Sequence, residues 1–125
     1  MKTAITLIIL LISFNSISQE KQCSSFRIGE FRYVKEDMPE RIIRNDTLQI
    51  EINPLDKVEI YSSIDWISEC EYTLTYEKIV NYPGDVSDLI GKKINVTIIE
   101  TKHNWYKVYA KGIFYEGEIE FIKIE

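Results

Sequence analysis

Histidine, cysteine, proline and glycine are all scarce in this chain of 125 residues. There is one histidine, His103, with two cysteines, three prolines and five glycines. A zinc site usually needs four nitrogen or sulfur ligands at close spacing, so this supply predicts no zinc site. His103 lies in the polar segment Thr101-Lys102-His103-Asn104, which is typical of an exposed turn rather than of a catalytic base. We therefore expect no enzyme, no metal site and no other cofactor.

The chain also lacks a basic stretch. Lysine and arginine number 15 and aspartate and glutamate 20, which gives a formal net charge of −5, and the two signs alternate along the sequence. Proteins that bind nucleic acids gather lysine and arginine on one face, because these residues displace the counterions of the phosphates. The composition therefore argues against DNA or RNA as a partner and indicates a soluble surface of mixed charge.

Long hydrophobic runs are missing as well. The longest one, residues 4–14, is too short to cross a membrane as a helix, which takes about 20 residues. Lys2 precedes this run, and Ser16-Ile17-Ser18 after it places small residues where a signal peptidase reads them. We predict a signal peptide at residues 1–18 and a single domain with no membrane span at residues 19–125. The protein would then be exported, to the periplasm or out of the cell.

Cys23 and Cys70 are the only cysteines. In an oxidising compartment outside the cytoplasm, two cysteines most often form one disulfide bond. The residues before Cys23 are Glu20-Lys21-Gln22, which are charged or polar where a lipid-attachment motif has small and apolar residues. We therefore predict a Cys23–Cys70 disulfide. Because it closes a long loop, the chain-entropy model gives it about 4 kcal/mol of stabilisation.

Apolar and polar side chains alternate with a period of two, which predicts an all-β fold. The clearest strands, residues 57–66 and 70–79, form a predicted hairpin. Further strands are expected at residues 26–34 with a bend at Gly29, and at 41–44, 48–53, 93–100, 105–110 and 113–124. The short connections predict an antiparallel up-and-down meander of seven or eight strands. Such a meander hides its edges by closing into a barrel, with a β-sandwich as the alternative.

One face of the predicted hairpin carries apolar and aromatic side chains, and the other carries charged and hydroxyl side chains. Large aromatic side chains with polar tips either fill a barrel or line a pocket for a small hydrophobic molecule. If there is a pocket, the predicted ligand-binding residues are Ile60, Ile64, Trp66, Tyr72, Leu74 and Tyr76.

Two segments, Gly29-Glu30-Phe31 and residues 66–76 (WISECEYTLTY), resemble small exported bacterial lipocalin-like proteins. The resemblance implies a barrel that holds a small hydrophobic ligand. Phe31 stands where lipocalins usually carry tryptophan, and the last predicted strand has no arginine to cover the barrel floor. The chain also resembles exported bacterial proteins of this size that carry the label DNA topoisomerase IV. A small domain without a basic face does not support that activity.

Two functions of different classes fit these observations. The first is binding of a small hydrophobic molecule inside the barrel. The second is an envelope-associated protein-interaction module without a cavity, which is motivated by the outward aromatic residues Tyr61, Trp105 and Tyr109. An open interior would favour the first function, and a filled interior the second.

Overall fold

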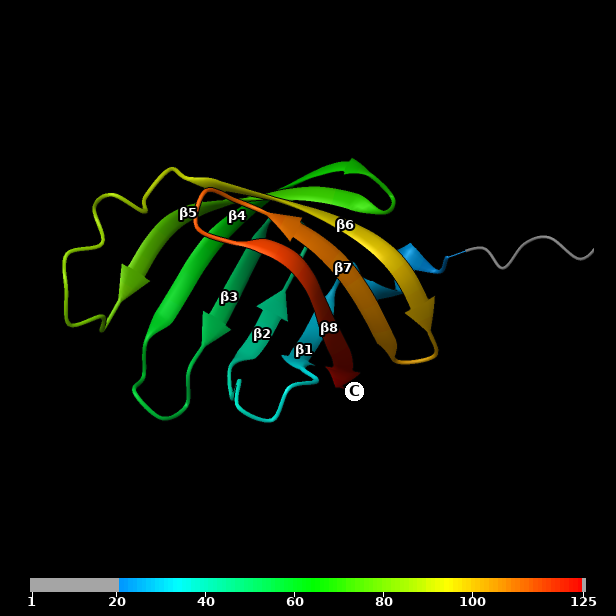
Figure 1. The fold of residues 1–125 in the computed structure, drawn as a ribbon, viewed down its shortest axis with the longest axis horizontal. Coiled ribbons are helices and arrows are strands. Elements are labelled where there is room, and N and C mark those ends of the chain that lie inside the picture. The colour runs from blue at the N-terminus through cyan, green and yellow to red at the C-terminus, as the bar shows by residue number, and fades with distance from the viewer. Residues whose placement is uncertain (1–20, 125) are drawn as a thin grey trace, which may run out of the picture.

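Eight antiparallel strands close into a barrel (Figure 1). The computed structural model describes residues 21–124, so the predicted signal peptide lies outside the described residues. The elements in chain order are a 3-10 helix, η1 (Cys23–Phe26), and the strands β1 (Gly29–Tyr33), β2 (Arg41–Arg44), β3 (Leu48–Ile52), β4 (Glu59–Ser68), β5 (Glu71–Val80), β6 (Lys93–Lys102), β7 (Trp105–Lys111) and β8 (Glu116–Ile124). Over this described range, no helix has the length and hydrophobicity that a membrane crossing requires.

Pairing between the first and last strands closes the sheet. Each strand pairs with the next one, and β8 returns to pair with β1, where Tyr33 lies opposite Phe121. Closure gives each strand of the described residues a neighbour on both sides, and so avoids the open edge that is the usual hazard of a sheet. The all-β, up-and-down antiparallel barrel is therefore confirmed, with eight strands, and the sandwich alternative is excluded. This architecture agrees with the resemblance to lipocalin-like proteins.

The predicted hairpin is the pair β4 and β5. Its register places Ile64 opposite Leu74 and Trp66 opposite Tyr72, so these apolar side chains share one face. Ile64, Leu74 and Tyr72 are buried, whereas Asp65 between them is exposed. The alternation of the sequence therefore turns one face of both strands into the barrel and the other towards solvent.

The first strand begins later than predicted. Residues 26–28 do not belong to it, because Cys23–Phe26 forms η1 and β1 starts at Gly29. Gly29 has a φ of 144°, a conformation that residues with a Cβ rarely adopt, and an added Cβ would lie 2.9 Å from Cε of Lys123. The bend predicted at Gly29 corresponds to this point, where the chain leaves the end of the barrel and enters its wall.

The connections between strands divide into two groups, because neighbouring strands run in opposite directions. We call the end with η1 and the β2–β3, β4–β5 and β6–β7 turns the closed end. The end with the β1–β2, β3–β4, β5–β6 and β7–β8 connections is the open end.

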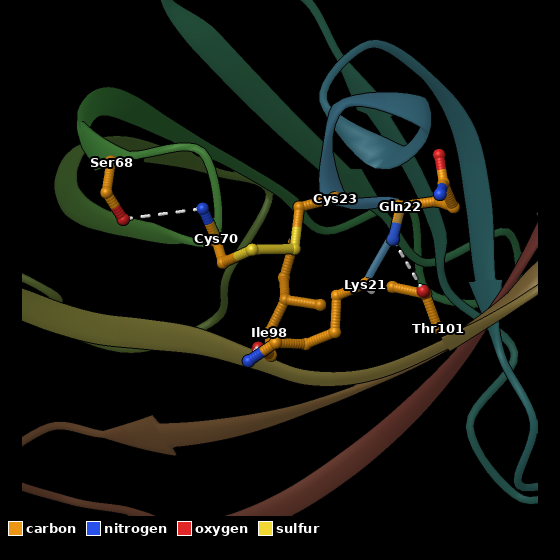
Figure 2. Close-up of a disulfide and its surroundings, with 7 residues drawn as sticks. All are labelled: Lys21, Gln22, Cys23, Ser68, Cys70, Ile98 and Thr101. Carbon is orange, nitrogen blue, oxygen red and sulfur yellow. Dashed lines mark hydrogen bonds between the residues drawn. A yellow bond between two sulfur atoms is a disulfide. The ribbon is translucent and has the colours of Figure 1, made fainter. Parts of the chain in front are cut away.

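The segment before β1 is fastened to the closed end (Figure 2). Sγ of Cys23 is bonded to Sγ of Cys70 in the β4–β5 turn, with the two Cα atoms 5.2 Å apart. The backbone N–H of Gln22 donates a hydrogen bond to Oγ1 of Thr101 on β6, over 2.8 Å. The predicted disulfide is therefore confirmed, and it indicates an oxidising compartment outside the cytoplasm.

Candidate functional site

The interior of the closed end is filled by aromatic rings. Tyr106 on β7 is fully buried, and its ring centroid lies 4.7 Å from that of Phe26, 5.6 Å from that of Phe31 and 5.0 Å from that of Phe121. Phe26 reaches this position because η1 is held across the barrel end. This half of the barrel is therefore a packed core.

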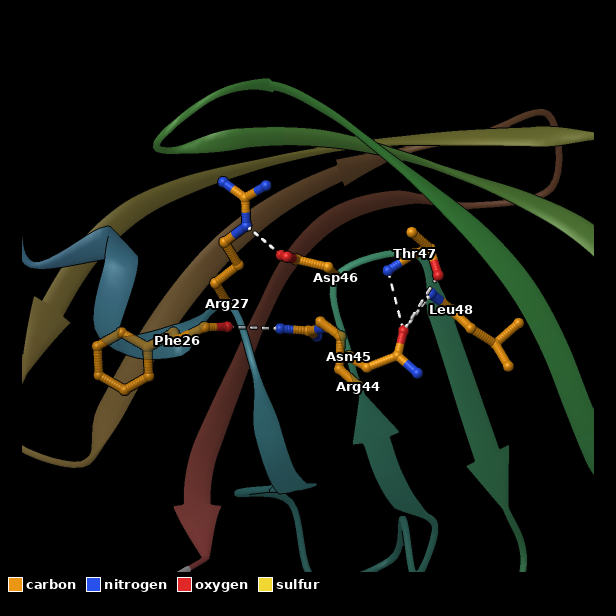
Figure 3. A network of polar contacts seen from close by, with 7 residues as sticks. All are labelled: Phe26, Arg27, Arg44, Asn45, Asp46, Thr47 and Leu48. Atoms are coloured by element: carbon orange, nitrogen blue, oxygen red, sulfur yellow. Dashed lines mark hydrogen bonds and ion pairs between the residues drawn. The ribbon is translucent and has the colours of Figure 1, made fainter.

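Arg44 of β2 lies inside the same cluster and is 2% exposed. Its guanidinium donates hydrogen bonds to the carbonyl of Phe26 at 2.8 Å, to Oε1 of Gln49 at 3.1 Å and to the hydroxyl of Tyr106 at 3.1 Å. Figure 3 shows the bond to Phe26. The guanidinium carbon also lies 4.6 Å from the ring centroid of Phe31, a cation–π distance. Arg44 therefore joins η1 to β2, β3 and β7.

The turn after Arg44 is fixed by local hydrogen bonds (Figure 3). Oδ1 of Asn45 accepts from the backbone N–H groups of Thr47 at 2.9 Å and Leu48 at 2.8 Å, which closes the tight β2–β3 turn. Asp46 in this turn pairs with Arg27, just after η1, at 2.7 Å. The turn and η1 are therefore joined beside the buried guanidinium.

The open half of the barrel encloses a cavity of about 440 Å³. Its apolar wall comes from β2, β5, β6, β7 and β8 and includes Ile42, Leu74, Val96, Val108, Ala110 and Phe121. Met38 of the β1–β2 loop and Tyr115 of the β7–β8 turn line it at the open end. Its volume falls within the range of about 300–1,000 Å³ that is usual for small-molecule pockets.

The predicted ligand-binding residues form two groups, according to the strand that carries them. Those on β5, namely Tyr72, Leu74 and Tyr76, line the cavity. Those on β4, namely Ile60, Ile64 and Trp66, do not belong to its lining. Ile64 is part of the packed core, and the ring of Trp66 lies 4.6 Å from that of Tyr72 and 4.6 Å from the guanidinium carbon of Arg27. A role of these residues in binding a ligand stays a prediction.

Sequence reasoning missed the polar residues that β3 contributes to the cavity. Gln49 and Glu51 line the cavity, and the more hydrophobic residues Leu48 and Ile50 alternate with them. Hydropathy alone would place the apolar side of this strand inside. The register with β4 indicates instead that the polar side faces inwards, because Gln49 lies opposite the buried Ser62.

Glu51 is the carboxylate on the cavity wall at β3. The hydroxyl of Tyr33 donates a hydrogen bond to its Oε1. Burial raises the pKa of Glu51, the hydrogen bond from Tyr33 acts in the opposite direction, and the negative charge of Glu40 raises the pKa further. Burial and the charge of Glu51 also raise the pKa values of Tyr33 and Tyr76. The largely apolar surroundings therefore disfavour the ionised form of Glu51.

The raised pKa of Glu51 predicts a pH-dependent cost to stability. Below its ordinary value of 4.5, Glu51 is protonated in both the folded and the unfolded chain. As the pH rises through the higher pKa of the folded state, the buried carboxyl loses its proton, and the free energy of unfolding falls. We expect Glu51→Gln to be more stable than the wild type at neutral pH, with a difference that shrinks as the pH falls towards 4.5. Denaturant unfolding of both proteins across this range measures it, and a difference that does not change with pH would contradict it.

The outward aromatic residues have polar partners on the barrel surface. The hydroxyl of Tyr61 donates to Glu59 at 2.6 Å, and Nε1 of Trp105 donates to Glu120 at 3.1 Å. The hydroxyl of Tyr109 donates to Glu116. Their rings therefore cover the outer wall with their polar tips satisfied, and none of the three lines the cavity.

Among residues 21–124, no group of three or more histidine, cysteine, aspartate or glutamate side chains is placed to hold a metal ion. The cavity is thus a largely apolar chamber with the Glu51–Tyr33 pair on its wall, and its lining also includes the exposed residues Lys35, Glu118 and Glu120. Comparisons of the chain with protein-family models, with curated proteins and with solved structures find no match.

Proposed function

We propose that this protein binds a small, largely apolar molecule inside the open half of its barrel. The single observation that carries the proposal is the cavity of about 440 Å³, which is enclosed by side chains from most of the strands. Its apolar wall offers the hydrophobic contact that gives a small ligand most of its affinity, and its few polar groups would orient the ligand.

The division of the barrel into two halves supports this proposal. A barrel of eight strands is just wide enough for side chains to fill it or for one small ligand to occupy it. Here the closed half is filled by Tyr106 and its aromatic neighbours, while Ala110, further along β7, contributes only a methyl group to the wall of the open half. The small side chain at that position leaves room that a larger one would occupy.

Ala110→Trp tests the proposal, because the new side chain points into the cavity. We expect the wild type to bind the neutral fluorescent probe N-phenyl-1-naphthylamine saturably, with one probe per protein. We expect the affinity of Ala110→Trp to be at least about tenfold lower, since tenfold corresponds to only about 1.4 kcal/mol of lost contact. Fluorescence titration measures both affinities.

Lys111→Trp provides the matched control. Lys111 follows Ala110 on the same strand and is exposed, so the same large side chain is added outside the barrel. This variant should bind the probe as the wild type does. If Ala110→Trp also binds like the wild type, or if the wild type gives no saturable signal, the proposal is wrong.

We propose further that the protein acts after export, as a carrier or binding protein without a catalytic step or a cofactor. The Cys23–Cys70 disulfide supports a site of action outside the cytoplasm. Mass spectrometry of the protein secreted by its host tests this proposal. The expected mature form begins at Gln19, and a form that retains residues 1–18 would contradict it.

A further inference from the structure

Glu51 occupies an unusual position for a carboxylate. It lies on the cavity wall between Ile42 of β2 and Ile60 of β4, which are its partners in the sheet register. The hydroxyl of Tyr33, which donates a hydrogen bond to it, carries no positive charge. A carboxylate in apolar surroundings lowers stability unless a positive charge or several donors compensate for it.

A second carboxylate, that of Glu40, lies near Glu51. Glu40 directly precedes β2, and its charge raises the pKa values of both Glu51 and Tyr33. Its Oε2 atom is buried and has no hydrogen-bond partner among the described residues. Buried polar atoms are nearly always paired, so this oxygen points to a donor that the protein itself does not provide.

The charges around the two carboxylates are not balanced by the protein. Over residues 21–124, no lysine, arginine or histidine nitrogen lies within 4.0 Å of the carboxylate of Glu40 or Glu51. Lys35 lines the cavity but forms no ion pair with them. The hydroxyls of Tyr33 and Tyr76, whose pKa values are raised, are neutral at physiological pH. Two further carboxylates, those of Glu118 and Glu120 on β8, belong to the cavity lining and are exposed.

We propose that the ligand is an amphipathic amine, whose protonated nitrogen donates a hydrogen bond to Glu51 and is attracted by the nearby charge of Glu40, while its apolar body packs against the cavity wall. This inference rests on the proposed function and adds the class of ligand. An aliphatic amine, like the lysine side chain, is charged at neutral pH and carries three N–H donors. Charged hydrogen bonds are about twice as strong as neutral ones. A ligand with a carboxylate head would instead be repelled.

Three probes with the same ten-carbon chain test the proposal: decylamine, 1-decanol and decanoate. Isothermal titration calorimetry at pH 7 gives the affinity of the full-length mature protein for each. We expect decylamine to bind at least about tenfold more tightly than 1-decanol, as one charged hydrogen bond allows, and decanoate to bind most weakly. The Ala110→Trp variant should lose decylamine together with the other probes, which places the amine inside the barrel rather than on its acidic surface.

Glu51→Gln removes the charge but keeps the size of the side chain and an acceptor for Tyr33. The variant should lose the preference for decylamine over 1-decanol, with the affinity for 1-decanol unchanged. Glu40→Gln should lose part of the same preference. Glu36→Gln, which removes the same charge from an exposed position of the β1–β2 loop, should keep it.

The outcomes separate this inference from the proposed function. If 1-decanol binds as tightly as decylamine, or if Glu51→Gln keeps the preference, the amine proposal is wrong while the hydrophobic cavity stands. If decanoate binds most tightly, the amine proposal is wrong as well. If none of the three probes binds, the proposed function itself is wrong. Thermal unfolding of Glu51→Gln beforehand verifies that a lost preference does not come from a lost fold.

Discussion

Replacing Tyr106 by alanine is expected to lower the free energy of unfolding by about 3–5 kcal/mol, the range for deleting a buried aromatic side chain. Tyr106 is fully buried, contacts the rings of Phe26, Phe31 and Phe121, and accepts a hydrogen bond from Arg44. The substitution therefore opens a space in the packed half of the barrel and takes one acceptor from a buried guanidinium. Urea unfolding followed by circular dichroism measures the change.

Tyr109→Ala is the control for this experiment. Tyr109 lies on the same strand, but it is only partly buried and its hydroxyl bonds to Glu116 on the outer wall. We expect it to cost no more than about 1 kcal/mol, as is usual for substitutions near the surface. Equal losses in the two variants would show that the closed half is not the main packed core.

Removing the disulfide is the second substitution with a large expected effect. Cys23 and Cys70 are 47 residues apart in the sequence, so their bond restricts a long loop in the unfolded chain. We expect Cys23→Ser with Cys70→Ser to lower the free energy of unfolding by about 2–5 kcal/mol. Small domains have only about 5–15 kcal/mol in total, so this is a large share.

A reducing agent supplies an independent check on the same bond. It should lower the stability of the wild type by a similar amount and leave the double variant unchanged. The loss also has a local consequence, because the bond holds the start of η1 against the β4–β5 turn. Hydrogen exchange in residues 21–28 should therefore become faster. A double variant as stable as the oxidised wild type would contradict this account.

Much of the fold follows from the sequence, because alternation and closure constrain it strongly. The residues of β4 and β5 alternate without interruption over most of their length, so their shared apolar face is predictable. Short connections exclude parallel strands, and hiding the edges favours a barrel. The disulfide follows from the count of cysteines and the expected compartment. None of these predictions requires knowing in advance which residues far apart in the sequence come into contact.

The candidate site was less predictable, because it depends on contacts across the barrel. Arg44 ends a four-residue strand, where an arginine is normally solvated, and contacts from η1, β1, β3 and β7 bury it. The last strand carries no arginine, and the arginine buried in the closed end comes from β2. Glu51 was missed for the same reason, since its strand turns its polar side inwards.

The position of a residue along the barrel axis also cannot be predicted from the sequence. Leu74 and Ile64 are paired across β4 and β5 and share the inner face, yet only Leu74 lines the cavity. Alternation tells the inner face from the outer one, but the boundary between the filled and the open half depends on which side chains η1 and β7 bring into the barrel.

The central claim is that a small apolar ligand enters the open half of the barrel. Nuclear Overhauser effects between 1-decanol and methyl-labelled protein test it most directly, because they report distances between ligand and wall. We predict contacts with the methyl groups of Leu74, Val96 and Val108, which line the cavity. Contacts confined to the exposed methyl groups of Leu55 and Ile113, or none at all, would contradict the account.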